Sequence, residues 1–226
     1  MKITPEMIIL DTDPIIRTKS EKVTIPLSEE DKELLDAMIT YVRRSQDDEI
    51  AEAEHLRPAV GIAAIQLGIP KQLIAVSVPT ENGSDEFALA NPKIVSESVQ
   101  NAYLAQGEGC LSVAQEHEGY VYRHARITVT GYDLLRNEMI RVRASGYTAI
   151  CLQHEIDHLS GTLFYDRIHK DDPWKEDPEA VVIALGKGRP GERDRESRCH
   201  RIKQRNLSLF FLFCGDCFCQ SGQNYV

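Results

Sequence analysis

Two histidines, His154 and His158, lie four residues apart in an apolar segment, and Glu155 stands between them. On a helix this spacing places both imidazoles on one face, where they can bind one metal ion. The positions from Tyr147 to Leu159 are mostly apolar, which predicts a helix surrounded by protein on nearly every side. A chain that buries these three groups must fold around this helix and give the carboxylate a charge partner, and a divalent cation is such a partner.

The motif alone does not separate a metal site from an ordinary core. A His-Glu-x-x-His string also arises by chance, and buried histidines can be core residues that are simply hydrogen-bonded. A catalytic metal usually has three protein ligands and one open position. The rest of the chain must therefore supply a third ligand if the site is catalytic.

Length, charge and termini narrow the class of protein. The 226 residues, 42% of them hydrophobic, suit one domain with a real core. The net charge of −9 argues against a nucleic-acid groove or an anionic membrane surface as the main partner. The N-terminus lacks a signal-peptide pattern, and no apolar run approaches the roughly 18 residues of a membrane span, which predicts a cytoplasmic protein. In that compartment the six cysteines are expected to be free thiols, metal ligands or redox residues.

Two helices are predicted with definite ends. Ser28 is the predicted N-cap of an amphipathic helix that ends near Ser45 and carries acidic residues in its first turn. The helix with the two histidines is predicted to begin near Ser145 and to stop at Gly161. The polar segment at residues 46–58 between them is interpreted as a surface excursion that could end in a helical turn.

Short β-strands are predicted on both sides of these helices, with a turn at Asn82 and Gly83 joining the first two. The predicted strands are residues 73–76, 87–90, 125–132, 139–143, 163–165 and 180–184. The predicted fold class is α+β, with antiparallel or mixed sheets around a central buried helix and a second amphipathic helix near the N-terminus.

A change of composition divides the chain near residue 186. Residues 1–186 are predicted to form a single catalytic domain, while residues 187–226 are basic and cysteine-rich and are predicted to be a disordered or non-native extension. Cys214, Cys217 and Cys219 could form half of a metal site, but a second Cys-x-x-Cys pair is missing from the sequence.

Two loop segments carry residue types that suit a catalytic site. Residues 59–68 gather small and apolar residues around Gln66, so that backbone can pass close to a group that this amide could bind. A tight core turn with Gln66 bonded to local backbone is the interpretation that the segment alone favours. In the second segment, Gly107 and Gly109 stand close to Cys110 on a tightly turned or flexible loop, which places the thiol for chemistry.

Three separated segments match, in order and spacing, the signature motifs of the peptide deformylases. They are VGIAAIQ at residues 60–66, EGCLS at 108–112 and QHEIDH at 153–158. The chain resembles this family over about residues 7–184. Its insertions and its β-like end are similar to the branch common in Gram-positive bacteria, the type 2 enzymes.

This resemblance implies a set of ligands and catalytic groups. The implied ligands of one divalent metal ion are Cys110, His154 and His158, with water in the fourth position. Glu155 is implied as the group that takes a proton from that water and later gives it to the departing amine. The Gln66 amide and the backbone N–H of Leu111 are implied to stabilise the oxyanion.

The family resemblance also implies residues for the substrate and for support of the metal loop. The matching substrate positions are Val60, Gly61, Tyr147, Ile150 and Cys151, and three of these share a helix face with His154 by their spacing. Glu108 is implied to pair with Arg123 and so to fix the loop that presents Cys110. An alternative interpretation of Arg123 is a solvated strand residue, and Cys151 is assigned to packing rather than to metal binding.

The implied activity is removal of the formyl group from the N-terminal formyl-methionine of newly synthesised proteins, with release of formate. One thiolate and two imidazoles suit Fe(II), Zn(II), Ni(II) or Co(II), and the family implies Fe(II) as the working metal. The expected partners are N-formyl-methionyl peptides and nascent chains, met at the ribosome, with no DNA and no membrane. A monomer in a bacterial-type cytoplasm is expected.

Two alternatives stay open on the sequence. A metallopeptidase can use the same helix motif, although its third ligand normally lies downstream of the helix and not in an upstream Cys loop. A non-catalytic relative or binding module is the other alternative, because the first motif has Ala59 where Gly is usual and Ile65 where proline or a small residue is usual. The methyl group of Ala59 could crowd the peptide substrate. Ala114 also replaces a common proline, with less consequence expected.

Overall fold

The computed structural model describes residues 1–81 and 83–185. The α-helices in these residues are α1 (Glu29–Ser45), α2 (Asp48–Glu54) and α3 (Gly146–His158), and the 3₁₀ helices are η1 (Pro5–Met7), η2 (Pro14–Arg17), η3 (Ala64–Leu67) and η4 (Phe164–Arg167). The strands are β1 (Gly61–Ala63), β2 (Leu73–Thr80), β3 (Gly83–Glu97), β4 (Asn101–Leu104), β5 (Arg123–His124), β6 (Arg126–Asp133), β7 (Glu138–Ser145) and β8 (Val181–Ile183). The predicted tail at residues 187–226 and Asn82 of the predicted turn lie outside the described residues.

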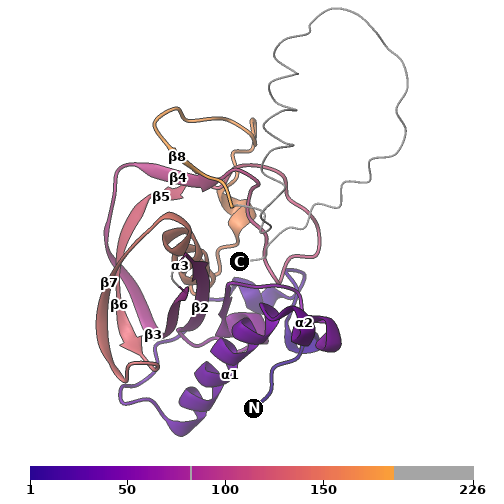
Figure 1. Ribbon diagram of the computed structural model, residues 1–226, viewed down its shortest axis with the longest axis vertical. Helices are drawn as coiled ribbons and strands as arrows, with labels where there is room; N and C mark the ends of the chain where they lie inside the picture. The colour runs from indigo at the N-terminus through magenta and orange to yellow at the C-terminus, as the bar shows by residue number, and fades with distance from the viewer. Residues whose placement is uncertain (82, 186–226) are drawn as a thin grey trace, which may run out of the picture. The chain divides into compact units, whose positions relative to one another are not determined.

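Two sheets surround α3, as the α+β prediction expected (Figure 1). The first has the strand order β1-β2-β3-β6-β7, and each neighbouring pair is antiparallel. The second has the order β5-β4-β8, in which β4 pairs antiparallel with β5 and parallel with β8. Because α3 contacts strands of both sheets, the helix with the two histidines is the centre of the domain.

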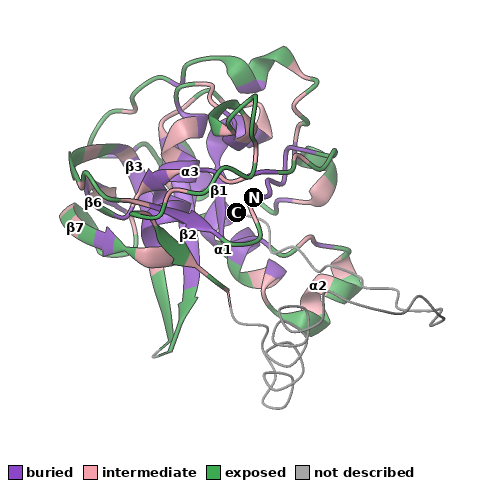
Figure 2. Cartoon of the chain, turned by 90° about the horizontal axis from the view of Figure 1, so that it is seen from above, coloured by how far each residue is buried: buried purple, intermediate pink, exposed green. Residues whose placement is uncertain are grey.

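Strand β2 is apolar at successive positions because both faces of the sheet are covered there. Leu73 and Ala75 belong to the core cluster that α1 packs against, whereas Ile74, Val76 and Val78 belong to the cluster with α3 residues. Successive side chains of a strand point to opposite faces, so one run of apolar residues serves both cores. Figure 2 shows this burial as purple in β2 and α3.

The first helix begins and ends as predicted. The Ser28 hydroxyl accepts a hydrogen bond from the Asp31 backbone N–H at 3.1 Å, which caps the N-terminus of α1, and the helix ends at Ser45. The predicted surface excursion that follows is more regular than expected. The Asp47 carboxylate accepts from the Ile50 N–H at 3.0 Å and starts α2.

The central helix also has the predicted bounds. It begins at Gly146, directly after Ser145, and ends at His158, three residues before Gly161. Gly161 has φ +73°, and a Cβ atom there would lie 2.1 Å from the Arg17 carbonyl oxygen. Only glycine fits this turn, which brings the N-terminal arm against the end of α3.

One strand prediction is wrong, and the three short strands β1, β4 and β5 were missed. Residues 163–165 were predicted as a strand but form the start of η4, because the Asp166 carboxylate accepts the Leu163 N–H at 2.8 Å and closes a turn. The predicted strand at 180–184 is confirmed as β8. Its partner β4, and β5 on the other side of β4, are short and lack a clear alternation. Within the described residues, no helix is long and apolar enough to cross a membrane.

Candidate metal centre and active site

Three predicted metal ligands lie together in the core. Ligand atoms of Cys110, His154 and His158 all lie within 4.8 Å of one another, and the three residues are buried. The Cys110 Sγ lies 3.4 Å from the His158 Nε2. The histidines come from one face of α3, while the cysteine comes from the loop between β4 and β5, so the site depends on the tertiary fold.

The unsatisfied atoms of this cluster fit a divalent metal. The His154 Nδ1 contacts the Glu108 Oε2 at 2.8 Å, and the buried Nε2 has no hydrogen-bond partner in residues 1–81 and 83–185. Burial raises the pKa of the Cys110 thiol and lowers the pKa of His158 well below its usual value. A neutral His158 imidazole is ready to bind a cation, and a coordinated thiol loses its proton outright. Three protein ligands are the usual number in a catalytic metal site.

Glu155 lies beside the ligands in a place that only a glycine leaves open. Its side chain is fully buried, and neither carboxylate oxygen has a hydrogen-bond partner among the described residues. Burial raises its pKa well above the usual range. A Cβ atom built on Gly61 would lie 2.4 Å from the Glu155 Oε1. Strand β1 therefore passes directly against this carboxylate, and Gly61 is needed for that close approach.

The substitution Gly61→Ala is expected to lower the free energy of unfolding by about 1–3 kcal/mol, because its methyl group would overpack the Glu155 site. Urea denaturation measures this cost. In a Glu155→Ala background the same substitution should cost much less, since the clashing carboxylate is absent. An equal cost in both backgrounds would show that Glu155 does not fill the space beside Gly61.

The contacts of Gln66 fit both interpretations of its segment, a local bond to backbone and an amide that can bind another group. Its side-chain carbonyl oxygen accepts the Ala63 backbone N–H at 2.8 Å, so one end of the amide is bonded locally. Its Nε2 lies 3.4 Å from the Cys110 Sγ and 3.2 Å from the Ser112 Oγ. The local bond therefore aims the amide N–H₂ group at the metal loop, although its catalytic role stays a prediction.

The loop that carries Cys110 has a further support that the sequence did not indicate. A guanidinium nitrogen of Arg57 donates to the Leu111 carbonyl oxygen, and Leu111 is fully buried. The Val113 N–H also donates to the Cys110 carbonyl at 3.2 Å. Arg57 lies far from this loop in the sequence, and its residue type fits a surface position equally well, so only the tertiary structure reveals the contact.

The two unusual residues of the first motif lie in the core. The Ser45 hydroxyl accepts the N–H of Ala59 at 3.1 Å, and the Gln46 side-chain amide donates to the Ala59 carbonyl at 2.8 Å. Both backbone groups of Ala59 are thus held by the end of α1, and its methyl group belongs to the core cluster on that side of the sheet. Ile65 is fully buried in the cluster around α3.

The predicted substrate residues lie near the metal helix. Val60 and Cys151 are buried in the same apolar cluster, and the half-buried Tyr147 packs against it. Ile150 is also fully buried on α3, and Cys151 is a free cysteine. Their proximity is compatible with a slot for an apolar side chain, and their contacts with a substrate stay predictions.

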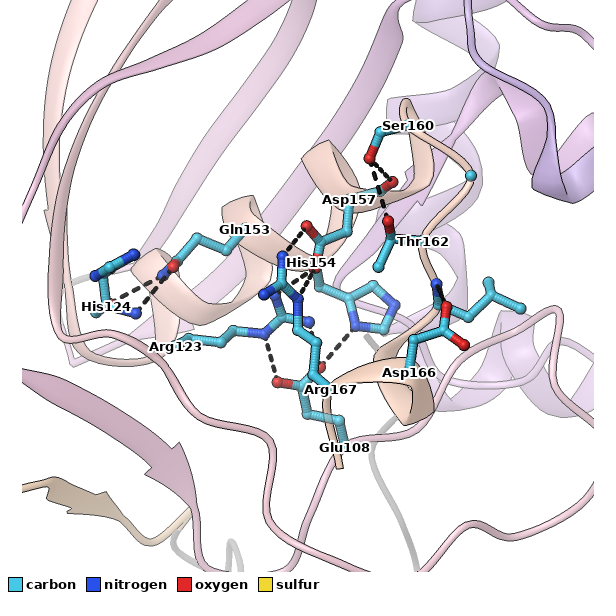
Figure 3. A network of polar contacts seen from close by, with 12 residues as sticks. Glu108, Arg123, His124, Gln153, His154, Asp157, Ser160, Thr162, Asp166 and Arg167 are labelled. Atoms are coloured by element: carbon cyan, nitrogen blue, oxygen red, sulfur yellow. Dashed lines mark hydrogen bonds and ion pairs between the residues drawn. The ribbon is translucent and has the colours of Figure 1, made fainter. Parts of the chain in front are cut away.

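Glu108 and Arg123 form the predicted pair, which is fully buried (Figure 3). The Arg123 Nε and Nη2 donate to the two oxygens of Glu108 at 2.6 and 2.8 Å. Burial alone would raise the pKa of Glu108, but the Arg123 charge and the bonds from Arg123 and His154 outweigh it and lower the pKa to about 2. An ionised Glu108 can therefore orient the His154 ring.

Comparisons of the sequence agree with this geometry. The family described as Polypeptide deformylase matches residues 5–174. A protein named Peptide deformylase 2 from Geobacillus stearothermophilus is 50% identical over 182 residues, which are 80% of this chain and 98% of that protein. Peptide deformylase 2 from Bacillus subtilis is 48% identical over 182 residues, with the same two coverages. These sources agree with the predicted Gram-positive branch.

Solved structures give the same assignment. The crystal structure of peptide deformylase from Ehrlichia chaffeensis has a TM-score of 0.60 and 30% identity, and the match covers 76% of this chain and 91% of that chain. A probable peptide deformylase from the Synechococcus phage S-SSM7 has a TM-score of 0.58 and 34% identity, over 71% of this chain and 97% of that chain. The Cys-His-His cluster, the family match and these relatives agree, and the chain belongs to the polypeptide deformylase family.

Proposed function

We propose that the buried site on α3 hydrolyses the N-formyl amide of N-formyl-methionyl peptides and releases formate. The observation that carries this proposal is the combination of three converging ligand atoms with the buried Glu155 carboxylate beside them, which has no hydrogen-bond partner among the residues described. When bound, a divalent metal lowers the pKa of its coordinated water, so that a nucleophile exists near neutral pH.

Glu155 is the proposed proton carrier. It neighbours the ligand His154 in sequence, and no donor in the described part of the chain bonds to either of its oxygens, so both can accept a proton. It takes a proton from the attacking water and gives it to the amine nitrogen when the formyl C–N bond breaks. Because Gly61 has no Cβ atom, the strand leaves room for this carboxylate.

Two N–H donors are proposed to stabilise the negative charge that develops on the formyl oxygen. The Gln66 amide is aimed at the metal loop because its carbonyl oxygen is held by Ala63. The backbone N–H of Leu111 follows Cys110 directly, on the loop that Arg57 supports. Loss of one preorganised donor of this kind raises a reaction barrier by about 3 kcal/mol.

The formylated peptide is proposed to extend along β1. This strand is at an edge of the five-stranded sheet and pairs only with β2 among the described strands. An extended peptide can add to such an edge through main-chain hydrogen bonds. The proposed slot for the methionine side chain is formed by Tyr147, Ile150 and Cys151 in the first half of α3 and by Val60, which shares an apolar cluster with Cys151.

We further propose Fe(II) as the working metal. The ligand set fits Fe(II), Zn(II), Ni(II) and Co(II) alike, and the resemblance to the deformylases favours iron. Nascent chains at the ribosome are the proposed source of substrate, and the enzyme is proposed to act as a cytoplasmic monomer. The upstream position of Cys110 disfavours the metallopeptidase alternative, whose third ligand follows the helix.

Removal and return of the metal test this proposal. Protein purified without oxygen and loaded with Fe(II) is expected to release formate from a formyl-Met peptide, and treatment with a chelator should abolish the release. Reloading with Fe(II) or Ni(II) should restore it, because the donors are provided by the folded protein. Absence of formate release with Fe(II), Ni(II) and Zn(II) alike would contradict the proposal and favour a binding module.

A further inference from the structure

Arg167 is the outermost member of a chain of charged groups that ends at the metal site (Figure 3). Its Nε and Nη2 donate to the two oxygens of Asp157, each at 2.6 Å. The Arg123 Nη1 donates to the same carboxylate at 2.9 Å. From Arg123 this series of charged groups continues through Glu108 to the Nδ1 of His154. Arg167 is 43% exposed, whereas Glu108 and Arg123 are each 1% exposed.

We propose that Arg167 is a positioning residue that acts through Asp157 on the metal ligand His154. The proposal rests on the metal site described above, and it assigns a role to two residues outside the ligands and the catalytic groups. Positive and negative charges alternate in this series of two arginines and two carboxylates, so each carboxylate contacts a guanidinium. Arg167 supplies the second cation that this arrangement needs.

The need for a second cation follows from the geometry of Arg123. One guanidinium lies between two carboxylates, with two donors on Glu108 and one on Asp157. Without Arg167, the carboxylates would compete for this single guanidinium, because Asp157 would lose its own bidentate partner. A shift of Arg123 toward Asp157 would loosen Glu108, and Glu108 orients the imidazole that binds the metal.

The position of η4 gives this interaction a second route to the same ligand. Phe164, in the same 3₁₀ helix as Arg167, lies nearly parallel to the His154 ring, with centroids 6.2 Å apart and planes at 19°. The bidentate contact of Arg167 with Asp157 therefore ties η4 to α3 one turn from that ring stack. Both the charge chain and the ring contact restrict the orientation of His154.

Arg43 offers a matched control for the loss of an exposed arginine. It donates through Nε and Nη2 to the two oxygens of Glu86 at 2.9 and 2.6 Å, and it is 46% exposed. This contact is bidentate, like that of Arg167 with Asp157, and it joins α1 to β3. Because Glu86 is not among the groups of the metal site, Arg43→Gln should reveal any general effect of losing such a pair.

The experiment uses the full chain loaded with Co(II) without oxygen. Release of Co(II) to EDTA is expected to be about 10-fold faster in Arg167→Gln than in the unsubstituted protein, the usual lower limit for loss of a group that orients a metal ligand. The visible absorption of bound Co(II) should shift as well. Arg167→Lys should lie between the two, since lysine keeps the charge and loses the planar fork.

Arg43→Gln should release Co(II) at the unsubstituted rate with an unchanged spectrum. A rate in Arg167→Gln within twofold of that rate, or an equal acceleration in Arg43→Gln, would overturn the proposal. If Arg167→Gln does not fold, Arg167→Lys is the variant that tests the proposal. Release of Co(II) from Arg167→Lys at the unsubstituted rate would then contradict the positioning role of Arg167. Formate release is measured on the same samples as an independent test of the proposed function. Its absence from the unsubstituted protein would contradict that function but not the role of Arg167 in metal binding.

Discussion

Replacement of Glu155 by glutamine is expected to lower kcat for formate release by about 10²–10⁴-fold, the usual contribution of a positioned general acid and base. Glutamine has nearly the same shape as glutamate, but its amide cannot take a proton from water and return it to an amine. The loss should appear in kcat and in kcat/KM together, because the proton transfer belongs to the transition state and not to substrate binding.

The same substitution is expected to leave the fold and the metal intact. Glu155 is fully buried, it has no hydrogen-bond partner within the residues that the structure describes, and burial raises its pKa well above the usual range. A neutral amide avoids the cost of burying a charge, so the thermal midpoint of the metal-free protein should not fall. Metal content and thermal midpoint are therefore measured beside kcat. Rates of formate release equal to those of the unsubstituted enzyme would contradict the proposed role of Glu155.

The residues of the central helix could be predicted because their arrangement is local. The spacing of His154 and His158 determines that they share a helix face, whatever surrounds the helix. Cys110 was found through its motif and its neighbouring glycines, but its distance from the two histidines depends on the loop between β4 and β5. The sequence can name such a ligand, and the fold has to bring it into place.

The outer part of the site could not be predicted for a related reason. Arg167 and Asp157 are ordinary surface residue types, and their importance comes from the way η4 lies against α3. The segment that carries Arg167 was itself predicted wrongly, because the three apolar residues at 163–165 suit a strand and a short turn equally well. The hydrogen bond from the Leu163 N–H to the Asp166 carboxylate favours the turn over the strand. A pattern of apolar residues cannot predict this bond, because the bond depends on the position of a polar side chain.

Strand β2 shows how a correct prediction can remain incomplete. Its apolar run predicts a strand. The run does not predict which helix packs on each face of that strand. Ile74 faces the core of α3 and Leu73 the core of α1, so the strand separates the two helices. The helices that cover a sheet follow from tertiary packing, which a run without alternation does not specify.

Removal of the charge of Arg123 is expected to have the largest effect on stability. Arg123→Met should lower the free energy of unfolding by about 3–5 kcal/mol, because it leaves the Glu108 carboxylate buried without its cation. Glu108 is 1% exposed, and its remaining hydrogen-bond partner is the imidazole of His154. Asp157 keeps its contact with Arg167, so the loss should come mainly from Glu108. Urea denaturation of the metal-free protein measures the change without a contribution from metal binding.

Two further variants show whether the uncompensated charge is the cause. Arg126→Met replaces an exposed arginine at the start of β6, whose side chain contacts Gln100. This substitution should change the free energy of unfolding by about 0.5 kcal/mol or less. In the double variant Arg123→Met with Glu108→Gln, the buried group is neutral, so part of the lost stability should return. A double variant no more stable than Arg123→Met would mean that lost packing of the Arg123 side chain, and not the unpaired carboxylate, accounts for the destabilisation.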